Sequence, residues 1–178
     1  MLLSRDGGVQ YIRFELLDTK LPAGRILERQ ESDRILGLPL DELAAQAAAT
    51  LFMAGVIWMC QISHYPLLAD VGDLTRYQPR NQRLTTYVVG LPMLVELATA
   101  AALVVRRPAA IPIWVAVLGL ALVAVIWVAT LRASVPMHER LARGFDAAAH
   151  RRLVRTNWIR TAAWTARGAL VLWMLGVA

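Results

Sequence analysis

Long apolar stretches alternate with polar, arginine-rich segments along the chain after residue 42. A helix needs about 20 apolar residues to cross the hydrocarbon core of a bilayer. The apolar stretches predict membrane-spanning helices at about residues 43–65, 85–105, 111–131 and 157–177. Because the connections are short, neighbouring spans should run antiparallel. The pattern predicts an all-α fold, namely a transmembrane four-helix up-down bundle with a short N-terminal extension.

The polar segments set the expected ends of these helices. Pro66 should end the first span, because proline has no N–H to donate and its ring clashes with the preceding turn. The segment 137–156 is too polar to cross a membrane, and it is predicted to form an interfacial helix before the fourth span. Residues 1–42 carry mixed charge without a long apolar run, so they do not resemble a signal peptide. We predict a partly disordered extension at 1–42 and one transmembrane domain at 43–178.

The composition agrees with a membrane protein and narrows its partners. The 178-residue chain is 57% hydrophobic, with a mean hydropathy of +0.48, which is too apolar for an ordinary soluble domain. The net charge of +6 comes mostly from arginines that flank apolar segments, where they meet lipid headgroups rather than nucleic acid. Abundant Ala and Arg are typical of a GC-rich bacterial genome. We therefore predict a multi-pass protein of the bacterial plasma membrane, in contact with lipid and with other membrane subunits.

The arginines also bear on membrane orientation. The positive-inside rule counts Lys and Arg close to the ends of the spans. The connections at 67–84 and 132–156 hold most of these arginines, which favours their placement in the cytoplasm and the termini outside. A 42-residue N-terminal segment that is not translocated argues for the reverse. The sequence leaves both orientations open.

An acidic residue stands near the centre of the second predicted span. Glu96 lies 11 residues after Thr85, which is about 16 Å along a helix. An ionisable group at such a depth is costly and normally faces the protein interior with a partner. Arg167 lies 10 residues after Asn157 in the fourth predicted span, at nearly the same depth. We predict that Glu96 and Arg167 form a buried ion pair.

A polar stripe marks one face of the fourth predicted span. Its residues recur at helical spacing, and a stripe that faced lipid would be apolar, so this one should point into the bundle. The predicted topology brings its beginning to the membrane face where the first span ends, next to Tyr65. We predict a polar intramembrane pocket lined by Tyr65, Asn157, Arg160, Trp164 and Arg167.

Three residues are candidates for catalysis in this pocket, namely Glu96, His64 and His138. Carboxyl and imidazole groups suit general acid–base work and proton transfer. The competing interpretation is an ion pair that fixes helix register, with histidines exposed to headgroups. The three residues come from different helices, as in metal sites of bundles. No HxxxH or ExxH pair accompanies them, so we predict no metal site, and the sequence assigns no cofactor.

Three motifs carry a resemblance to known proteins: QISHYPLLADVG at 61–72, LPMLVEL at 91–97 and TNWIRTAAWTARG at 156–168. Over about residues 44–175 the chain resembles a group of bacterial four-helix membrane proteins, which is distantly similar to the membrane family that includes the fungal anthrone oxygenases. The shared features are four spans, a polar stretch after the first, and a Trp/Asn/Arg motif that opens the last. In the closer group a His often stands near the position of Asn81, and the resemblance assigns no catalytic residues here.

Two functions from different classes fit these residues. The first is a membrane protein whose polar pocket supports oxygenase-like or other redox chemistry on a lipophilic substrate, such as a quinone or a polyketide-like aromatic. The alternative is a non-catalytic structural or accessory subunit of a larger membrane complex, in which the Glu96–Arg167 pair only sets helix packing. A small transporter is disfavoured, since no internal repeat is evident. The sequence leaves open whether the protein is an enzyme.

Overall fold

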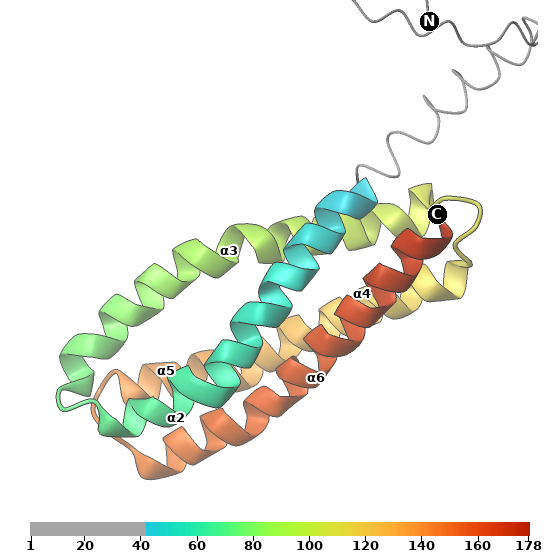
Figure 1. The fold of residues 1–178 in the computed structure, drawn as a ribbon. Coiled ribbons are helices and arrows are strands. Elements are labelled where there is room, and N and C mark those ends of the chain that lie inside the picture. Colours follow the sequence, from blue (N-terminus) through green and yellow to red (C-terminus); the bar gives the residue numbers. More distant parts are fainter. Residues whose placement is uncertain (1–41) are drawn as a thin grey trace, which may run out of the picture. The chain divides into compact units, whose positions relative to one another are not determined.

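The described part of the chain is built from long helical segments. The computed structural model describes residues 42–178, which are helical except for the last residue and the connections at 71–73, 107–112 and 142–146. These residues contain no strand, so the all-α prediction is confirmed for this part of the chain. The connections at 71–73 and 142–146 lie at one end of the helices, and the connection at 107–112 lies at the other (Figure 1).

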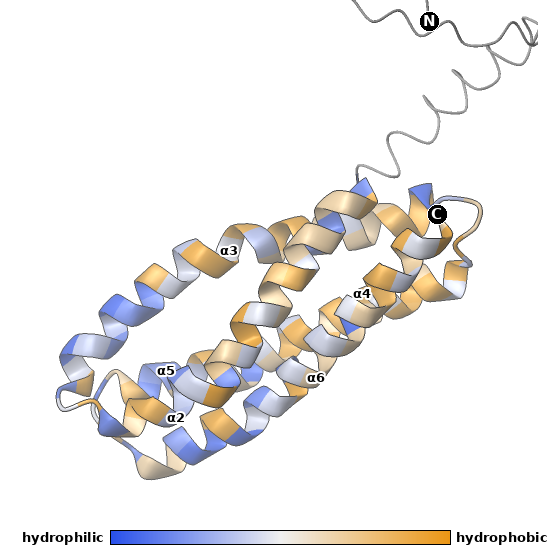
Figure 2. Cartoon of the chain, in the orientation of Figure 1, coloured by the Kyte–Doolittle hydropathy of each residue, from blue (hydrophilic) through white to orange (hydrophobic). Residues whose placement is uncertain are grey.

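Three of these helices are long and apolar enough to cross a membrane: Glu42–Asp70, Leu74–Arg106 and Ile113–Leu141. The predicted fourth span lies within helix α6 (Ala147–Val177), which is not among them. Its apolar half contains Arg160 and Arg167, which lower its hydropathy. Figure 2 shows most hydrophilic residues at the end where α6 begins, mainly apolar residues along the middle of the helices, and a few hydrophilic residues at the opposite end. The three apolar helices indicate a multi-pass membrane protein.

The prediction that Pro66 ends the first helix is wrong. The helix passes through Pro66 and continues to Asp70, with a π-helical turn, η1 (Cys60–His64), that ends two residues before the proline. The N–H of Tyr65 donates to the carbonyl of Cys60, five residues earlier. A wider turn of this kind gives room to a proline ring that would clash with an α-helical turn. The helix therefore continues into a short α-helical turn, α2 (Tyr65–Leu67), and a 3-10 turn, η2 (Leu68–Asp70).

The third long segment has the same arrangement. Helix α4 (Ile113–Ala129) widens into a π-helical turn, η3 (Thr130–Ser134), and continues as α5 (Val135–Leu141). The N–H of Val135 donates to the carbonyl of Thr130, again five residues earlier and directly before a proline, Pro136. Turns of this type bend a helix and change the direction of its side chains. Two such turns, from different segments, lie beside the cavity described below.

Two further boundaries differ from the sequence prediction. Helix α3 begins at Leu74, well before the predicted start of the second span at residue 85, because Asp73 caps it by accepting from the N–H of Arg76. The predicted interfacial helix at 137–156 is two helices, α5 and the start of α6. Gly144 adopts a positive φ of 140° between them, which other residues rarely do. The connection ends at a second acidic cap, Asp146.

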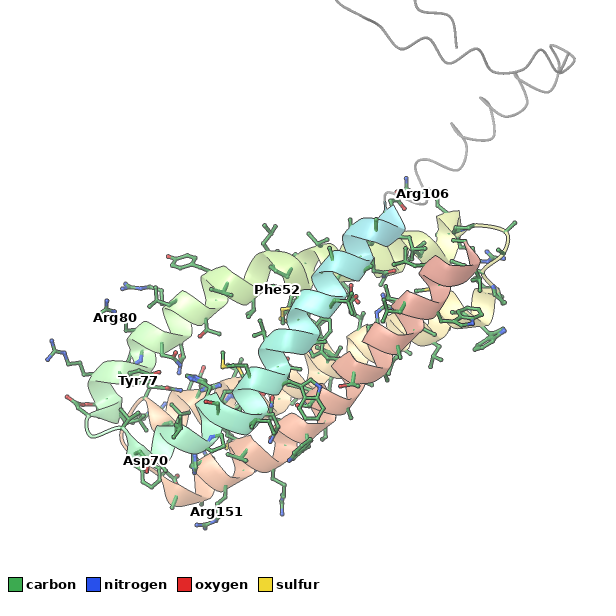
Figure 3. The ribbon with its side chains drawn as sticks, viewed as in Figure 1. Phe52, Asp70, Tyr77, Arg80, Arg106 and Arg151 are labelled. Carbon is green, nitrogen blue, oxygen red and sulfur yellow. The ribbon has the colours of Figure 1, made fainter. Side chains whose placement is uncertain are left out.

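Asp146 opens α6 by accepting hydrogen bonds from the N–H groups of Ala148 and Ala149. These bonds favour the carboxylate and lower the pKa of Asp146 below its ordinary value. Figure 3 shows the side chains of Arg80 and Arg151 pointing outward at this end, whereas Arg106 lies at the opposite end. Both ends of the apolar region therefore carry arginine.

The core runs along the length of the described chain in two apolar clusters. The larger cluster joins all four long segments near η1 and η3, and Trp164 of α6 is its largest side chain that is fully buried. The smaller cluster lies towards the connection at 107–112 and includes Leu43, Leu103, Ile111, Val115 and Val171. Apolar packing thus fixes the helices around the polar groups described next. Of the predicted extension at 1–42, residues 1–41 lie outside the described part of the chain.

Candidate functional site

Glu96 of α3 and Arg167 of α6 form the predicted ion pair. Arg167 Nε donates to Glu96 Oε1 at 2.5 Å, and both side chains are only 1% exposed. The prediction that these two residues pair is confirmed. Burial of either charge alone would be costly, so the bond between them stabilises both.

Two residues of the first helix complete this ion-pair cluster. Thr50 Oγ1 donates to Glu96 Oε2 at 2.7 Å. With its amide oxygen turned towards Arg167, Gln46 accepts from Arg167 Nη2 and, at 3.1 Å, from the N–H of Ala100. Both carboxylate oxygens of Glu96 and two of the three guanidinium nitrogens of Arg167 therefore have partners. These hydrogen bonds join the first helix, α3 and α6 and hold the three helices in register.

Gly119 of α4 gives the Arg167 guanidinium its space. A methyl group at Gly119 would overlap Arg167 Nη1, which the bond to Glu96 holds in place. Gly119→Ala should therefore lower the free energy of unfolding by about 1–3 kcal/mol, the usual cost of overpacking. Gly90→Ala is the matched control, because among the described residues no atom beyond the adjoining backbone of its own helix and its two chain neighbours lies within 4 Å of the added methyl group. Denaturant titrations in detergent measure both, and equal stability of the two variants would contradict this packing.

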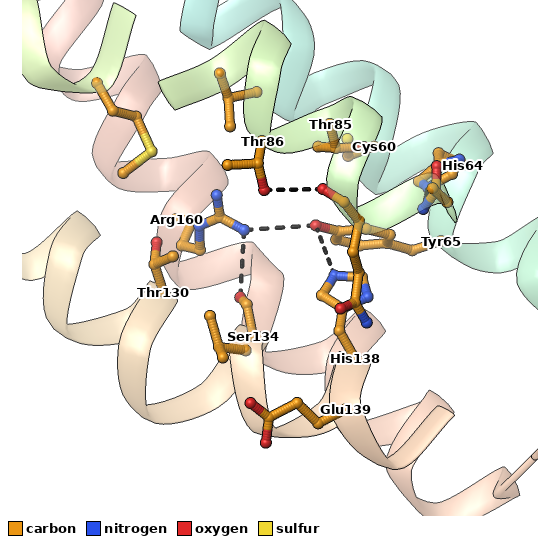
Figure 4. Close-up of a pocket in the computed structure, with 15 residues that line it drawn as sticks. Cys60, His64, Tyr65, Thr85, Thr86, Thr130, Ser134, His138, Glu139 and Arg160 are labelled. Carbon is orange, nitrogen blue, oxygen red and sulfur yellow. Dashed lines mark hydrogen bonds between the residues drawn. The ribbon is translucent and has the colours of Figure 1, made fainter. Parts of the chain in front are cut away.

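A separate cavity, with polar side chains set among a larger apolar surface, lies near the end of the helices where α6 begins. Its volume is about 280 Å³, which is close to the lower limit for small-molecule sites. The π-helical turns and the residues that follow them supply its walls, together with one face of α3 and Arg160 of α6 (Figure 4). The lining residues are Cys60, His64, Tyr65, Asn81, Gln82, Thr85, Thr86, Val89, Met93, Thr130, Ser134, Val135, His138, Glu139 and Arg160.

Arg160 is the buried charge of this cavity. Its side chain is 7% exposed, and Nη1 donates to Ser134 Oγ and Asn157 Oδ1, each at 3.2 Å, and to Tyr65 OH at 3.5 Å. Figure 4 shows the guanidinium extending between Ser134 and Tyr65. Nε is buried, and no described residue forms a hydrogen bond with it. Within residues 42–178 the ion pairs are Arg167–Glu96 and Arg106–Glu42, and neither involves Arg160.

A chain of polar contacts runs from Arg160 through the Tyr65 hydroxyl to His138. The Tyr65 OH lies 3.5 Å from His138 Nε2, and Gln78 Nε2 lies 2.5 Å from His138 Nδ1. The Tyr65 and His138 rings also pack edge to face, with centroids 5.3 Å apart. Because the Gln78 amide N–H donates to Nδ1, the neutral imidazole carries its proton on Nε2, which faces the Tyr65 oxygen.

His64 lies on the other side of Tyr65 in the same cavity. Its Nε2 is 3.2 Å from Asn81 Nδ2. Asn81 therefore faces a catalytic candidate, although the sequence analysis did not select it. Glutamine and threonine side chains of α3, among them Gln82 and Thr86, continue the polar wall next to Asn81. No periodic signal in the sequence distinguished them from a solvated helix face.

The structure brings together only some of the predicted site residues. Of the predicted residues, Tyr65, His64, His138 and Arg160 line this cavity. Glu96, Asn157, Trp164 and Arg167 do not line it. Arg160 and Arg167 share a helix face but lie two turns apart, which is about 10 Å along the axis. Trp164, buried in the core between them, separates the two polar groups.

Asn157 has a supporting position rather than a place in the cavity wall. It is fully buried, its Nδ2 donates to Gln61 Oε1 at 2.9 Å, and its Oδ1 accepts from Arg160. It therefore fixes the Arg160 guanidinium from behind. Among the described residues, no three His, Cys, Asp or Glu side chains gather in the way that metal ligands do.

The comparisons with known proteins give no family for the chain. No protein-family model matches it, and neither the search of curated proteins nor the search of solved structures finds a similar protein.

Proposed function

We propose that the protein is an integral membrane protein whose cavity binds a lipophilic substrate for oxygenase-like or other redox chemistry. The observation that carries the proposal is the make-up of the cavity. Val89 and Met93 give it an apolar wall on α3, while His64, Tyr65 and Arg160 give it a polar wall. A quinone or a polyketide-like aromatic has the matching combination of apolar rings and hydrogen-bonding oxygens.

The membrane placement is part of the proposal. We propose that α6 is a fourth span and that the four helices form an up-down bundle in a bacterial plasma membrane. Its arginines Arg160 and Arg167 are buried, whereas Ile159, Leu172 and Trp173 on its other faces are exposed. A helix of this kind suits a bilayer, because its apolar side chains face lipid while its charges face protein. The arginine-rich connections would then lie in the cytoplasm.

In the proposed chemistry, the side chains of the cavity orient the substrate and move protons. Arg160 and the Tyr65 hydroxyl would donate hydrogen bonds to a substrate oxygen. His138 would exchange a proton through Tyr65, and His64 would serve the opposite side of the cavity. The proposed resemblance to the anthrone-oxygenase membrane family agrees with a lipophilic aromatic substrate.

The alternative proposal is a structural or accessory subunit of a larger membrane complex. The favouring observation is the ion-pair cluster, which is well satisfied and lies away from the cavity. Such a cluster stabilises helix packing without chemistry. The exposed apolar faces would then contact other membrane subunits instead of lipid alone.

Binding of a quinone to His64→Ala and His138→Ala separates the two proposals. A suitable probe is 2,3-dimethyl-1,4-naphthoquinone, which has no open ring position for the Cys60 thiol to attack. We expect each variant to fold as wild type does and to bind the probe roughly 3–10 times more weakly, the effect of one lost hydrogen bond. Tryptophan fluorescence of protein in phosphatidylcholine nanodiscs measures binding. Wild-type protein that binds no quinone, or variants that match it, would favour the accessory subunit.

The visible absorption spectrum and the metal content of the purified protein complete this test. Absorption bands or a stoichiometric metal would identify the redox partner that the proposed chemistry uses. If neither is present, the redox equivalents have to come from dioxygen or from the quinone itself.

His150→Ala is a matched control for the two histidine variants in the quinone-binding test. His150 contacts the carbonyl of Tyr65 at 2.8 Å without lining the cavity.

A further inference from the structure

We infer that the cavity recognises an oxyanion on its ligand and that Arg160 is the receptor for that charge. The inference rests on the proposed function, because it assumes that the cavity holds a ligand. The ligand class is a lipophilic molecule with a carboxylate, phenolate, enolate or phosphate group. A neutral quinone lacks this group and should bind less tightly.

The charge of Arg160 is uncompensated in the described part of the chain. Arg167, seven residues later on the same helix, has a buried carboxylate partner at 2.5 Å. Arg160 is buried almost as deeply and has only the neutral oxygens of Tyr65, Ser134 and Asn157. A buried guanidinium is costly unless a negative charge accompanies it. A ligand anion would supply the missing charge.

The acidic residue that lines the cavity, Glu139, does not neutralise the charge of Arg160. Glu139 lines the cavity, but its side chain is exposed and forms no ion pair with Arg160. In Figure 4 the Glu139 carboxylate points away from the Arg160 guanidinium, and Ser134 lies between the two in this view. The cavity therefore contains a buried cation without a buried anion.

The hydrogen-bonding capacity of the cavity points the same way. Within the described residues, every hydrogen bond of the Arg160 guanidinium comes from Nη1, and Nε has no partner. Gln82 Nε2 is a second buried nitrogen without a partner, and Gln82 lines the same cavity. A buried N–H donor without a partner is costly, so a ligand that brings an acceptor would be stabilised in this cavity. A charged acceptor forms a stronger hydrogen bond than a neutral one.

Three neighbours hold the guanidinium ready for such a ligand. Asn157, itself fixed by Gln61, anchors Nη1 from the core side, while Ser134 and Tyr65 anchor it from η3 and α2. A receptor that is already oriented loses little conformational freedom on binding. The π-helical turn η3 supplies Ser134, and η1 supplies Gln61, which holds Asn157, so both turns have a role in recognition.

A pair of matched naphthoquinones tests the inference. The anionic probe is 2-hydroxy-3-methyl-1,4-naphthoquinone at neutral pH, and the neutral probe is 2-methoxy-3-methyl-1,4-naphthoquinone. In phosphatidylcholine nanodiscs, wild type should bind the anionic probe about tenfold or more tightly than the neutral one. Arg160→Gln should abolish this preference, and Arg160→Lys should retain part of it. Arg155→Gln, which removes an exposed arginine five residues earlier, should leave it unchanged.

The outcomes separate this inference from the proposed function. Equal binding of the two probes by wild type, or an unchanged preference in Arg160→Gln, would overturn the oxyanion receptor while the lipophilic cavity stands. Failure of all three naphthoquinones to bind would overturn both. If Arg160→Gln does not fold, Arg160→Lys carries the test, and a preference equal to that of wild type would count against a guanidinium receptor.

Competition by an anionic lipid shows whether the natural oxyanion belongs to a lipid headgroup or to a free lipophilic acid. Phosphatidylglycerol added to the nanodiscs should leave the anionic probe bound if the natural ligand is a free lipophilic acid. Competition by phosphatidylglycerol that disappears in Arg160→Gln would identify a lipid phosphate as the oxyanion. Competition of equal strength in Arg155→Gln and Arg160→Gln would contradict a phosphate site at Arg160.

Discussion

Glu96→Gln should lower the free energy of unfolding by about 3–5 kcal/mol, since it removes one partner of a buried ion pair. Arg167 would keep its charge in the core, with Gln46 as its remaining partner. Arg167→Leu should cost a similar amount, because Glu96 would keep only the hydrogen bond from Thr50. Unfolding in mixed detergent micelles, titrated with a denaturing detergent, measures each change.

The double variant distinguishes a direct pair from two independent effects. Glu96→Gln combined with Arg167→Leu should recover much of the loss, because neither buried charge remains. Glu139→Gln is the control, since this exposed acid of α5 forms no ion pair with any residue of 42–178 and should change stability little. Losses that simply add in the double variant would show that the two side chains act independently.

Val89→Phe should abolish binding of 2,3-dimethyl-1,4-naphthoquinone. Val89 lies on the apolar wall of the cavity, and a cavity of about 280 Å³ has little room for a benzyl side chain together with a two-ring ligand. We expect affinity to fall by a factor of about 100 or more, corresponding to the loss of roughly 2.7 kcal/mol of binding free energy. Fluorescence titration in nanodiscs measures this loss.

The adjacent valine provides a control for Val89→Phe. Val88 is 53% exposed on the outer face of α3, so Val88→Phe adds the same side chain outside the cavity. It should bind the quinone as wild type does. Loss of binding in both variants would indicate a general disturbance of α3 rather than filling of the cavity.

The ion pair could be predicted from the sequence because depth in a membrane follows from residue counting. Glu96 and Arg167 are the charges farthest inside their apolar stretches, and a helix rises by a fixed amount per residue. The cost of burying either charge alone makes a partner nearly obligatory. Gln46 and Thr50, which complete the cluster, carry no such signal, because neutral polar side chains are common in helices. Gly119 is informative only once Arg167 is placed against it.

The cavity was predictable only in part. Helical spacing placed Arg160 on the inner face of α6, and the topology brought Tyr65 and His138 to the same end. The same reasoning assigned Arg167 and Trp164 to the cavity, because a helix face does not show where along its length a large side chain fills the core. The π-helical turns were missed for a related reason. Pro66 signals a break in an α-helix, but a widened turn before it lets the helix continue.

Alkylation of Cys60 tests most directly whether the cavity is a binding site. Cys60 is the only cysteine in the chain, and it lines the cavity, so its reaction with a maleimide reports on that space without any substitution. We expect saturating 2,3-dimethyl-1,4-naphthoquinone to slow alkylation of the folded protein in nanodiscs by about tenfold or more, a change equivalent to roughly 1.4 kcal/mol. A rate that the quinone does not change, with the quinone in excess, would contradict a ligand site between the two π-helical turns.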